Sequence, residues 1–335
     1  MATVTSDKDL PKPLDTTSKQ VKALKKLVAE HLGKPVKHVD RPPLQGMFSR
    51  TLFVTLADGT QGVVQFRITK LDLDTFNKAR TVLGSYVPEV TLLASQELED
   101  AGAWVYYLQR IPGTIWLRGI AGKGDPGRIA INKSLGRVFS KGFIDESSHD
   151  AVERIVQPHI NAILKSKREE ISPFKDKLRD LSSRLERLAS LPLWISHCDL
   201  NEVNVLIDEN CDVTGLVDWE YSYPLPFGLG FGRIHTLAGE YHEGEFEMSD
   251  GFEEAERGFW DSMFEGMPDS VRQNLLGQYL DAVQDAVLLG TFMDCFFLDE
   301  VAHEVGVASV SLKALPKFLT YRLPHIRGDE SPYQI

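Results

Sequence analysis

Cysteine is scarce in this 335-residue chain, and no cysteine pair has the spacing of a metal site. The three cysteines, Cys198, Cys211 and Cys295, lie far apart and form no C-x-x-C motif. We therefore expect neither a zinc site nor a disulfide framework. Reduced cysteines also suit the cytoplasm, where thiols are kept reduced.

Long apolar runs and an excess of positive charge are also lacking. No segment approaches the roughly 20 apolar residues of a membrane helix, and the first 15 residues lack the apolar stretch of a secretory signal. The formal net charge is −11, from 37 basic and 48 acidic residues. Nucleic acid binding depends on basic residues, so we do not expect it here. The composition predicts a cytoplasmic protein without membrane contact and leaves its oligomeric state open.

The first third of the chain predicts a sheet. Residues 1–16 have little apolar content and are expected to form a loose arm, and apolar residues between 21 and 32 recur at helical spacing. Two β-rich runs, 49–56 and 61–68, flank an Asp-Gly turn and predict a hairpin. Further strands are expected near 90–93 and 103–110, with a helix from Asp72 to Leu83.

Helical patterns dominate beyond residue 113. Apolar spacing predicts helices over 178–188, 271–287, 292–307 and 312–318, and the glycine-rich segment 122–127 is expected to be a connecting loop. The chain is long enough for two lobes. We therefore predict an α+β fold with a small β-rich lobe and a larger helical lobe.

The segment from His197 to Glu220 is where chemistry is expected. Two short strands around a turn at 208–212 predict a hairpin, and residues equidistant from a turn face each other across such a hairpin. This brings Asn204 and Asp218 together at the open end, within reach of Asp199.

These residue types suit a magnesium site. Mg²⁺ takes oxygen ligands, so the carboxylate of Asp218 and the amide carbonyl of Asn204 are suitable. The carboxylate of Asp199, not bound to metal, is able to accept a hydroxyl proton. Positioning and charge neutralisation of this kind are what phosphoryl transfer needs.

The motif H-x-D-x-x-x-x-N, followed by a hairpin and D-W-E, resembles the aminoglycoside phosphotransferase family, which is similar in fold to choline and protein kinases. The chain looks like fungal members of the family in the segments VVQFR, SHCDLNEVNVL and GLVDWE. The likeness is tight over residues 197–220 and extends in lobe order over about 45–320. It implies a two-lobed kinase-like fold, ATP and Mg²⁺ as cofactors, and a small-molecule substrate. It also implies an N-terminal arm and helix (1–40), a nucleotide-side lobe (41–112), a catalytic lobe (113–325) and a tail (326–335).

The resemblance assigns roles to the motif residues. Asp199 would be the catalytic base, Asn204 and Asp218 would hold Mg²⁺, and His197 would brace the loop. Glu220, after D-W, is a less defined second acid. Each residue alone has a commoner structural interpretation, as a core histidine, a turn residue or a cap, but the joint spacing favours the functional one.

On the nucleotide side, the resemblance implies a cation on the third strand that holds the ATP phosphates. Gln65 occupies the expected position and is neutral. Arg67 follows two residues later on the same face of the strand, and its guanidinium suits phosphate, although it is also readable as a surface arginine. Asp74 is the candidate partner of that cation, or an ordinary acid at a helix start. Ser49 belongs to the expected phosphate loop, which is not a P-loop.

Three functions follow from these residues. The first is an ATP- and Mg²⁺-dependent kinase of a small hydroxylated metabolite, in secondary metabolism or detoxification. Glu240 belongs to an acidic run that would attract an amine of this substrate or would simply be a solvated loop. The second is a kinase fold repurposed for cyclisation or condensation of a natural product, which the missing lysine at Gln65 favours. The third is a catalytically dead nucleotide-binding scaffold, against which the retained Asp199 argues.

Overall fold

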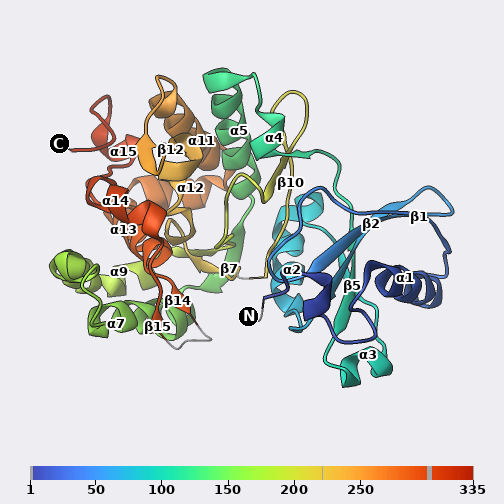
Figure 1. Cartoon of the computed structure of the whole chain (residues 1–335). Coiled ribbons are helices and arrows are strands. Elements are labelled where there is room, and N and C mark those ends of the chain that lie inside the picture. The colour runs from blue at the N-terminus through green and yellow to red at the C-terminus, as the bar shows by residue number, and fades with distance from the viewer. Residues whose placement is uncertain (1–2, 221, 300–303, 335) are drawn as a thin grey trace. The chain divides into compact units, whose positions relative to one another are not determined.

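The structure is a computed structural model that describes residues 3–220, 222–299 and 304–334. The chain divides into two units, shown in Figure 1 and described separately below. Unit 1 comprises Met1–Arg80 and Val87–Ile111, and unit 2 comprises Thr81–Tyr86 and Pro112–Ile335.

Unit 1 is built on an antiparallel five-stranded sheet with the strand order β1-β2-β3-β5-β4. Its strands are β1 (Val36–Asp40), β2 (Arg50–Leu56), β3 (Gln61–Arg67), β4 (Val90–Leu92) and β5 (Trp104–Gln109). The predicted hairpin is confirmed, because β2 pairs with β3 in the register Thr51↔Gln65. Gly59 has φ 88° in the turn, a conformation that favours glycine.

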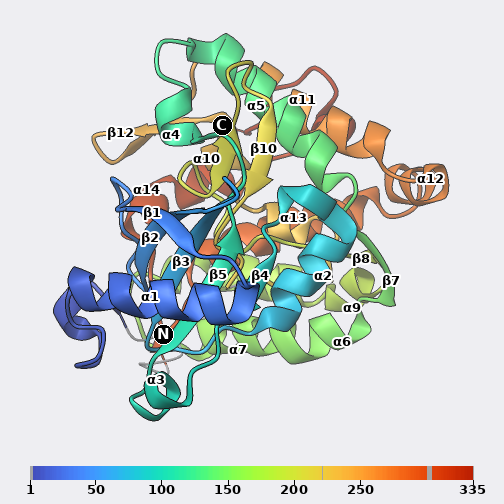
Figure 2. The same cartoon turned by 90° about the vertical axis from the view of Figure 1, so that its right-hand side faces the viewer.

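Two helices cover opposite faces of this sheet, α1 (Thr17–Leu32) and α2 (Leu73–Leu83), as Figures 1 and 2 show. A short helix, α3 (Gln96–Asp100), precedes β5. On the α1 face, Leu24 and Val28 are buried against Val54 and Val64. Their removal from water stabilises the unit by about 25 cal/mol per Å² of apolar surface. Thr16 and Gly33 cap the two ends of α1, as the residue types predict.

The prediction of a loose arm over residues 1–16 is wrong for residues 3–16, and residues 1–2 lie outside the described residues. Val4, Leu10 and Leu14 are 0%, 3% and 0% exposed and belong to the core of unit 1. The Val4 amide donates to the Met47 carbonyl at 2.6 Å, and the Arg50 guanidinium donates to the Val4 carbonyl. Three well-placed apolar residues are enough to fix a segment whose average composition is polar.

Unit 2 is mainly helical, which confirms the predicted α+β class. Its helices are α4 (Trp116–Gly119), α5 (Gly124–Phe139), α6 (His149–Ala151), α7 (Gln157–Lys165), α8 (Lys175–Ser182), α9 (Leu185–Ala189), α10 (Ile234–Ala238), α11 (Phe252–Gly266), α12 (Asp269–Leu276), α13 (Leu280–Cys295), α14 (Ser309–Phe318) and α15 (Pro324–Arg327). None of the helices in the described residues has both the length and the apolar character needed to cross a lipid bilayer.

Short sheets and hairpins connect these helices. Their strands are β6 (Thr114–Ile115), β7 (Phe143–Ser147), β8 (Pro192–Trp194), β9 (Val205–Ile207), β10 (Val213–Leu216), β11 (Leu225–Pro226), β12 (Glu240–His242), β13 (Glu245–Glu247), β14 (Leu298–Asp299) and β15 (Glu304–Val305). One sheet has the order β10-β9-β6 and another β11-β8-β7, while β12 with β13 and β14 with β15 form separate two-stranded sheets.

Several helix predictions for unit 2 need correction. The helix predicted over 292–307 is wrong in the described residues, because α13 ends at Cys295 and is followed by β14 and β15, while residues 300–303 lie outside the described residues. The helix predicted over 271–287 is interrupted at Gly277, whose ψ of −97° is not helical. The predicted loop 122–127 instead contains the start of α5. Apolar spacing indicates helical character well but does not locate the breaks.

The C-terminal segment is tied to α11 by a buried ion pair. Arg327 donates to Glu256 at 2.8 Å, and both side chains are 0% exposed. The Tyr321 hydroxyl also donates to Glu256, and Trp260 Nε1 donates to the Tyr321 oxygen at 2.7 Å. Buried charges require such partners, so this network fixes the segment on the helical unit.

Candidate active site

His197 anchors the loop that carries the predicted catalytic residues. The loop joins β8 to β9, and His197 is 1% exposed within it. Its Nε2–H donates to the carbonyl of Val217 at 2.7 Å, and its ring meets the Trp219 ring edge-on at a centroid distance of 4.6 Å. Burial lowers the His197 pKa to about 4, so the ring is neutral near pH 7. The side chain therefore holds the loop against the backbone that leads to Asp218.

Asp199 is half-buried and held by side-chain donors of the same loop. Asn204 Nδ2 donates to Asp199 Oδ2 at 3.0 Å and to its backbone carbonyl at 2.8 Å. Asn201 Nδ2 donates to Asp199 Oδ1 at 3.1 Å. The side-chain nitrogen of Asn204 donates to Asp199, so the side-chain oxygen is the atom of Asn204 that could bind a cation.

Asp218 follows β10 in an uncommon backbone conformation. Its φ is 67°, in the left-handed region that non-glycine residues rarely adopt. The Val217 amide donates to the Asn204 carbonyl at 2.9 Å, so the residue paired with Asn204 directly precedes Asp218. Such conformations cluster at functional sites, where the surroundings enforce them. Asp218 is exposed and Glu220 is half-buried.

Arg233 contacts Asp199 from a segment far away in the sequence. Its Nη1 lies 3.2 Å from Asp199 Oδ1, and its Nε donates to Asp294 near the end of α13. The approach depends on the preceding glycine: a Cβ at Gly232 would lie 2.3 Å from the Gly290 backbone of α13. Sequence spacing did not reveal Asp294, and the only local signal for Arg233 is its position after the G-x-G that follows D-W-E.

A second arginine, Arg128 of α5, contacts the loop that carries Asp199 at Glu202. It lies 3.6 Å from Glu202 in that loop and 3.1 Å from Glu240 of β12, and it donates to the Gly239 carbonyl at 2.9 Å. Burial raises the pKa of Glu202. Glu240, predicted to attract an amine, therefore already has a cationic partner within the chain.

The residues predicted to bind the nucleotide lie in unit 1. Arg67 Nη1 donates to Gln65 Oε1 at 3.2 Å, so the two side chains share one face of β3 as expected. Arg67 is 2% exposed and Ser49 is 4% exposed, with the Ser49 hydroxyl 3.2 Å from that of Thr51. Asp74 is exposed in the first turn of α2. Their role toward a nucleotide stays a prediction.

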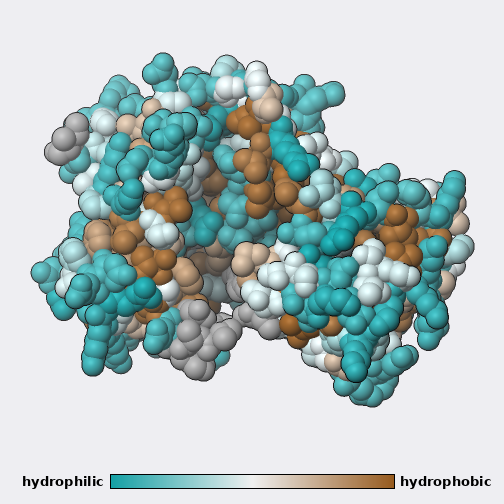
Figure 3. Space-filling view, in the orientation of Figure 1, coloured by the Kyte–Doolittle hydropathy of each residue, from teal (hydrophilic) through white to brown (hydrophobic). Residues whose placement is uncertain are grey.

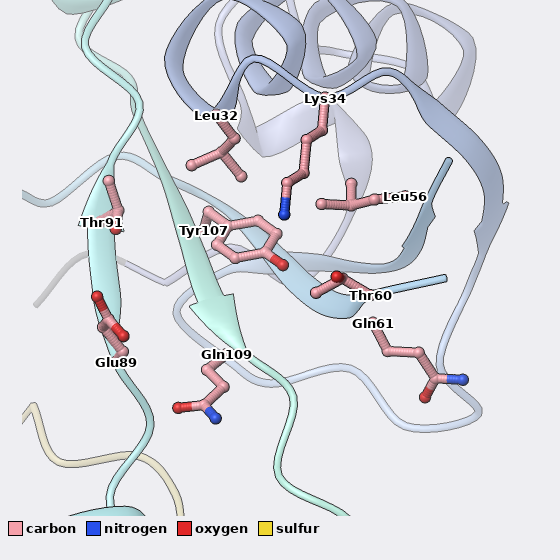
Figure 4. A pocket seen from close by; sticks show the side chains of 9 residues that line it. All are labelled: Leu32, Lys34, Leu56, Thr60, Gln61, Glu89, Thr91, Tyr107 and Gln109. Carbon is pink, nitrogen blue, oxygen red and sulfur yellow. The ribbon is translucent and has the colours of Figure 1, made fainter. Parts of the chain in front are cut away.

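A surface pocket of about 350 Å³ lies elsewhere on unit 1 (Figure 4). Lys34 points into it beside the Tyr107 ring, with Glu89 on the opposite side. Lys34 is paired with Asp58 at 2.7 Å. Neither Gln65 nor Arg67 lines this pocket, so it is separate from the predicted nucleotide residues. Within the described residues, no group of three or more His, Cys, Asp or Glu side chains is arranged to hold a metal.

Burial of His197 should make stability depend on pH. The unfolded histidine takes up a proton below its ordinary pKa of 6.5, whereas the folded one does so only near 4. Stability should therefore fall as pH falls through this window, by about 2 kcal/mol between pH 7 and pH 5 for a shift of this size. Urea unfolding at both pH values, compared with His197→Asn, measures it. His235, also neutral through burial, titrates in both proteins and cancels from the difference. An equal pH dependence in the two proteins would contradict the assignment.

Comparisons with known proteins give one family match and several solved structures. The model of the phosphotransferase enzyme family matches residues 145–242, which contain His197, Asp199, Asn204 and Asp218. A search of curated proteins finds no match.

Solved structures with related folds are distant in sequence. An ethanolamine kinase from Plasmodium vivax is 12% identical, with a TM-score of 0.55 over 93% of this chain and 86% of that one. Macrolide 2'-phosphotransferase MphH from Brachybacterium faecium is 14% identical, with a TM-score of 0.49 over 88% and 97%. A thermostable mutant of aminoglycoside phosphotransferase APH(4)-Ia, in ternary complex with ADP and hygromycin B, is 16% identical, with a TM-score of 0.47 over 81% and 98%. The likeness to the ethanolamine kinase shows that this chain has a kinase-like fold.

Proposed function

We propose that this protein transfers the terminal phosphoryl group of ATP to a hydroxyl of a small molecule. The observation that carries the proposal is the hydrogen-bonded pair of Asp199 and Asn204 in the loop before β9, with Asp218 in a left-handed conformation two residues after β10. The family match over residues 145–242 and the kinase-like fold support it.

Asp199 would act on the acceptor. Three side-chain donors hold its carboxylate, and a carboxylate retains lone pairs for a further hydrogen bond. It would orient the acceptor hydroxyl and take its proton as the oxygen attacks phosphorus. Arg233, in contact with both Asp199 and Asp294, would keep the carboxylate in place and offset its negative charge.

The donor set fits a magnesium ion. The Asn204 carbonyl oxygen and the Asp218 carboxylate would hold Mg²⁺, which when bound neutralises charge on the nucleotide phosphates. In unit 1, Arg67 would supply the cation that holds the phosphates, with Gln65 accepting a hydrogen bond that orients its guanidinium. Arginine suits this task because its planar fork matches phosphate geometry.

One observation favours a second candidate. Gln65 is neutral, and it is engaged with Arg67 rather than carrying a charge of its own. A kinase-like protein that performs cyclisation or condensation on a natural product would have no need of a phosphate-binding cation at this position. The two candidates differ in whether the protein binds ATP together with Mg²⁺.

Calorimetric titration with ATP, with Mg²⁺ and with EDTA, tests the proposed function. We expect binding at least about tenfold tighter with Mg²⁺, because the metal links phosphate oxygens to protein ligands. Arg67→Met should weaken the binding of ATP in the presence of Mg²⁺, whereas Arg41→Met, which changes an exposed arginine of the same unit, should not. No binding at millimolar ATP would reject the kinase and favour the second candidate.

A further inference from the structure

Unit 2 leaves several large apolar side chains exposed. Within the described residues, six are at least 40% exposed, and we call them the apolar rim: Leu117, Val203, Met248, Phe297, Leu298 and Val310. Figure 3 shows hydrophobic surface near α4 and around α14. An exposed apolar set of this kind commonly marks a binding surface.

Part of the apolar rim belongs to the catalytic loop or touches it. Val203 lies within the loop, directly before Asn204. The amide of Leu117 in α4 donates to the carbonyl of Glu202 at 3.0 Å, which places α4 beside the loop. These two residues therefore lie in, or directly beside, the loop that carries Asp199.

The other part of the apolar rim is connected to Asp199 through Arg233. Arg233 binds both Asp199 and Asp294, and Phe297 follows Asp294 by three residues. The Phe297 ring packs over Gly306, where a Cβ would lie 2.4 Å from it, and the Ala308 amide donates to the Cys295 carbonyl at 2.8 Å. The segment that carries Phe297 and Leu298 therefore packs against the start of α14, which carries Val310.

The β12–β13 hairpin reaches the same place. The Tyr241 hydroxyl of β12 is buried, and burial raises its pKa. Lys313 of α14 pairs with Glu245 of β13 at 2.8 Å. Met248, which follows β13, is thereby held on the same side of unit 2 as α14.

Carboxylates around Asp199 are paired with cations of the chain. Arg128 pairs with Glu202 and Glu240, and Arg233 pairs with Asp199 and Asp294. A polycationic acceptor would have to displace these arginines or approach them against like charge. The carboxylates at these positions are therefore paired with arginines of the chain, although the net charge of the whole chain is acidic.

We propose that the acceptor is an uncharged alcohol or phenol with a large apolar body, which the apolar rim binds while its hydroxyl meets Asp199. This inference rests on the proposed function, because it names the acceptor of the same reaction. The acceptor oxygen forms the new bond to the terminal phosphorus of ATP, the bond from that phosphorus to the bridging oxygen breaks, the hydroxyl proton passes to Asp199, and ADP leaves. Apolar contacts supply the affinity, and the hydrogen bond of the hydroxyl fixes the orientation of the acceptor, as in most small-molecule sites.

Fluorescence titration with N-phenyl-1-naphthylamine, an uncharged apolar probe, tests the binding surface. We expect saturable binding that 2-naphthaleneethanol displaces and the polycation neomycin does not. Val310→Glu and Phe297→Glu should each weaken binding at least about tenfold, because each places a charge where an apolar body is buried. Asn161→Asp on α7, which adds the same charge at an exposed position, should have no effect.

The titration with ATP and Mg²⁺ on the same samples separates the two proposals. Probe binding without ATP binding would reject the kinase and keep the apolar site. ATP binding with displacement by neomycin, or with no change in the Val310→Glu and Phe297→Glu variants, would reject the apolar acceptor and keep the kinase. Circular dichroism of both variants checks that they fold. If Phe297→Glu does not fold, the conclusion rests on Val310→Glu alone.

Discussion

Replacement of Asp199 by Asn should lower turnover by about a hundredfold to ten-thousandfold, the range lost when a general base is removed. The change keeps the shape of the side chain and removes the negative oxygen that would take the acceptor proton. Binding of ATP with Mg²⁺ should change little, because Asp199 is not one of the proposed metal ligands. Release of ADP, measured with the best alcohol among those that displace the naphthyl probe, gives the turnover, and calorimetry gives the nucleotide affinity.

The matched control for this experiment is Asp208, in the β9–β10 hairpin that follows the loop of Asp199. Asp208 accepts hydrogen bonds from the amides of Asn210 and Asp212, each at 2.9 Å, and thus stabilises the β9–β10 turn. An asparagine at position 208 still accepts such bonds, so Asp208→Asn should keep its activity. Loss of the contact between Asp199 and Arg233 should cost about 1 kcal/mol or less, because the pair is partly exposed. Full activity in Asp199→Asn would exclude it as the base.

The sequence predicted that the residues of the loop before β9 and of the β9–β10 hairpin lie close together, because their contacts are local. His197, Asp199, Asn204 and Val217 contact one another within one loop and one hairpin, and the alternation of strand residues fixes such contacts. The β2–β3 hairpin and the shared face of Gln65 and Arg67 were predicted for the same reason. Spacing along the chain is sufficient information for geometry of this range.

The arginines around Asp199 were beyond such reasoning. Arg128 comes from the second turn of α5, and Asp294, the partner of Arg233, comes from the last turn of α13; neither interrupts a helical pattern. They reach the loop because helices and connecting segments pack closely, as at Gly232, which lies against the Gly290 backbone of α13. Which side chains converge through such packing depends on tertiary structure, and no periodicity in the sequence encodes it.

The failed predictions of secondary structure have a related cause. Residues 292–307 contain enough apolar side chains for a helix, yet α13 ends at Cys295 and the paired strands β14 and β15 follow. The same apolar residues fit either structure when the segment is short. For the arm at residues 1–16, average polarity concealed the burial of Val4 and Leu14. Burial of individual residues was decided by contacts with distant segments.

Removal of the Asp218 carboxylate should abolish the effect of Mg²⁺ on ATP binding. Asp218 is the charged member of the proposed ligand pair, and Asn204 alone offers a neutral oxygen, whereas Mg²⁺ prefers carboxylates with phosphate oxygens and water. Asp218→Asn is the cleaner variant, because asparagine also tolerates the left-handed conformation with φ 67° and only the charge is lost. Asp218→Ala removes the ligand altogether.

The expected result for both variants is an ATP affinity in Mg²⁺ that equals the affinity in EDTA. Asp212→Ala provides the control, since Asp212 lies just before β10, pairs with Arg137 at 2.6 Å and carries the same charge. It should keep the full dependence on Mg²⁺. If Asp218→Asn kept that dependence as well, the metal would have to be held elsewhere, and the left-handed backbone at Asp218 would need a structural rather than a catalytic explanation.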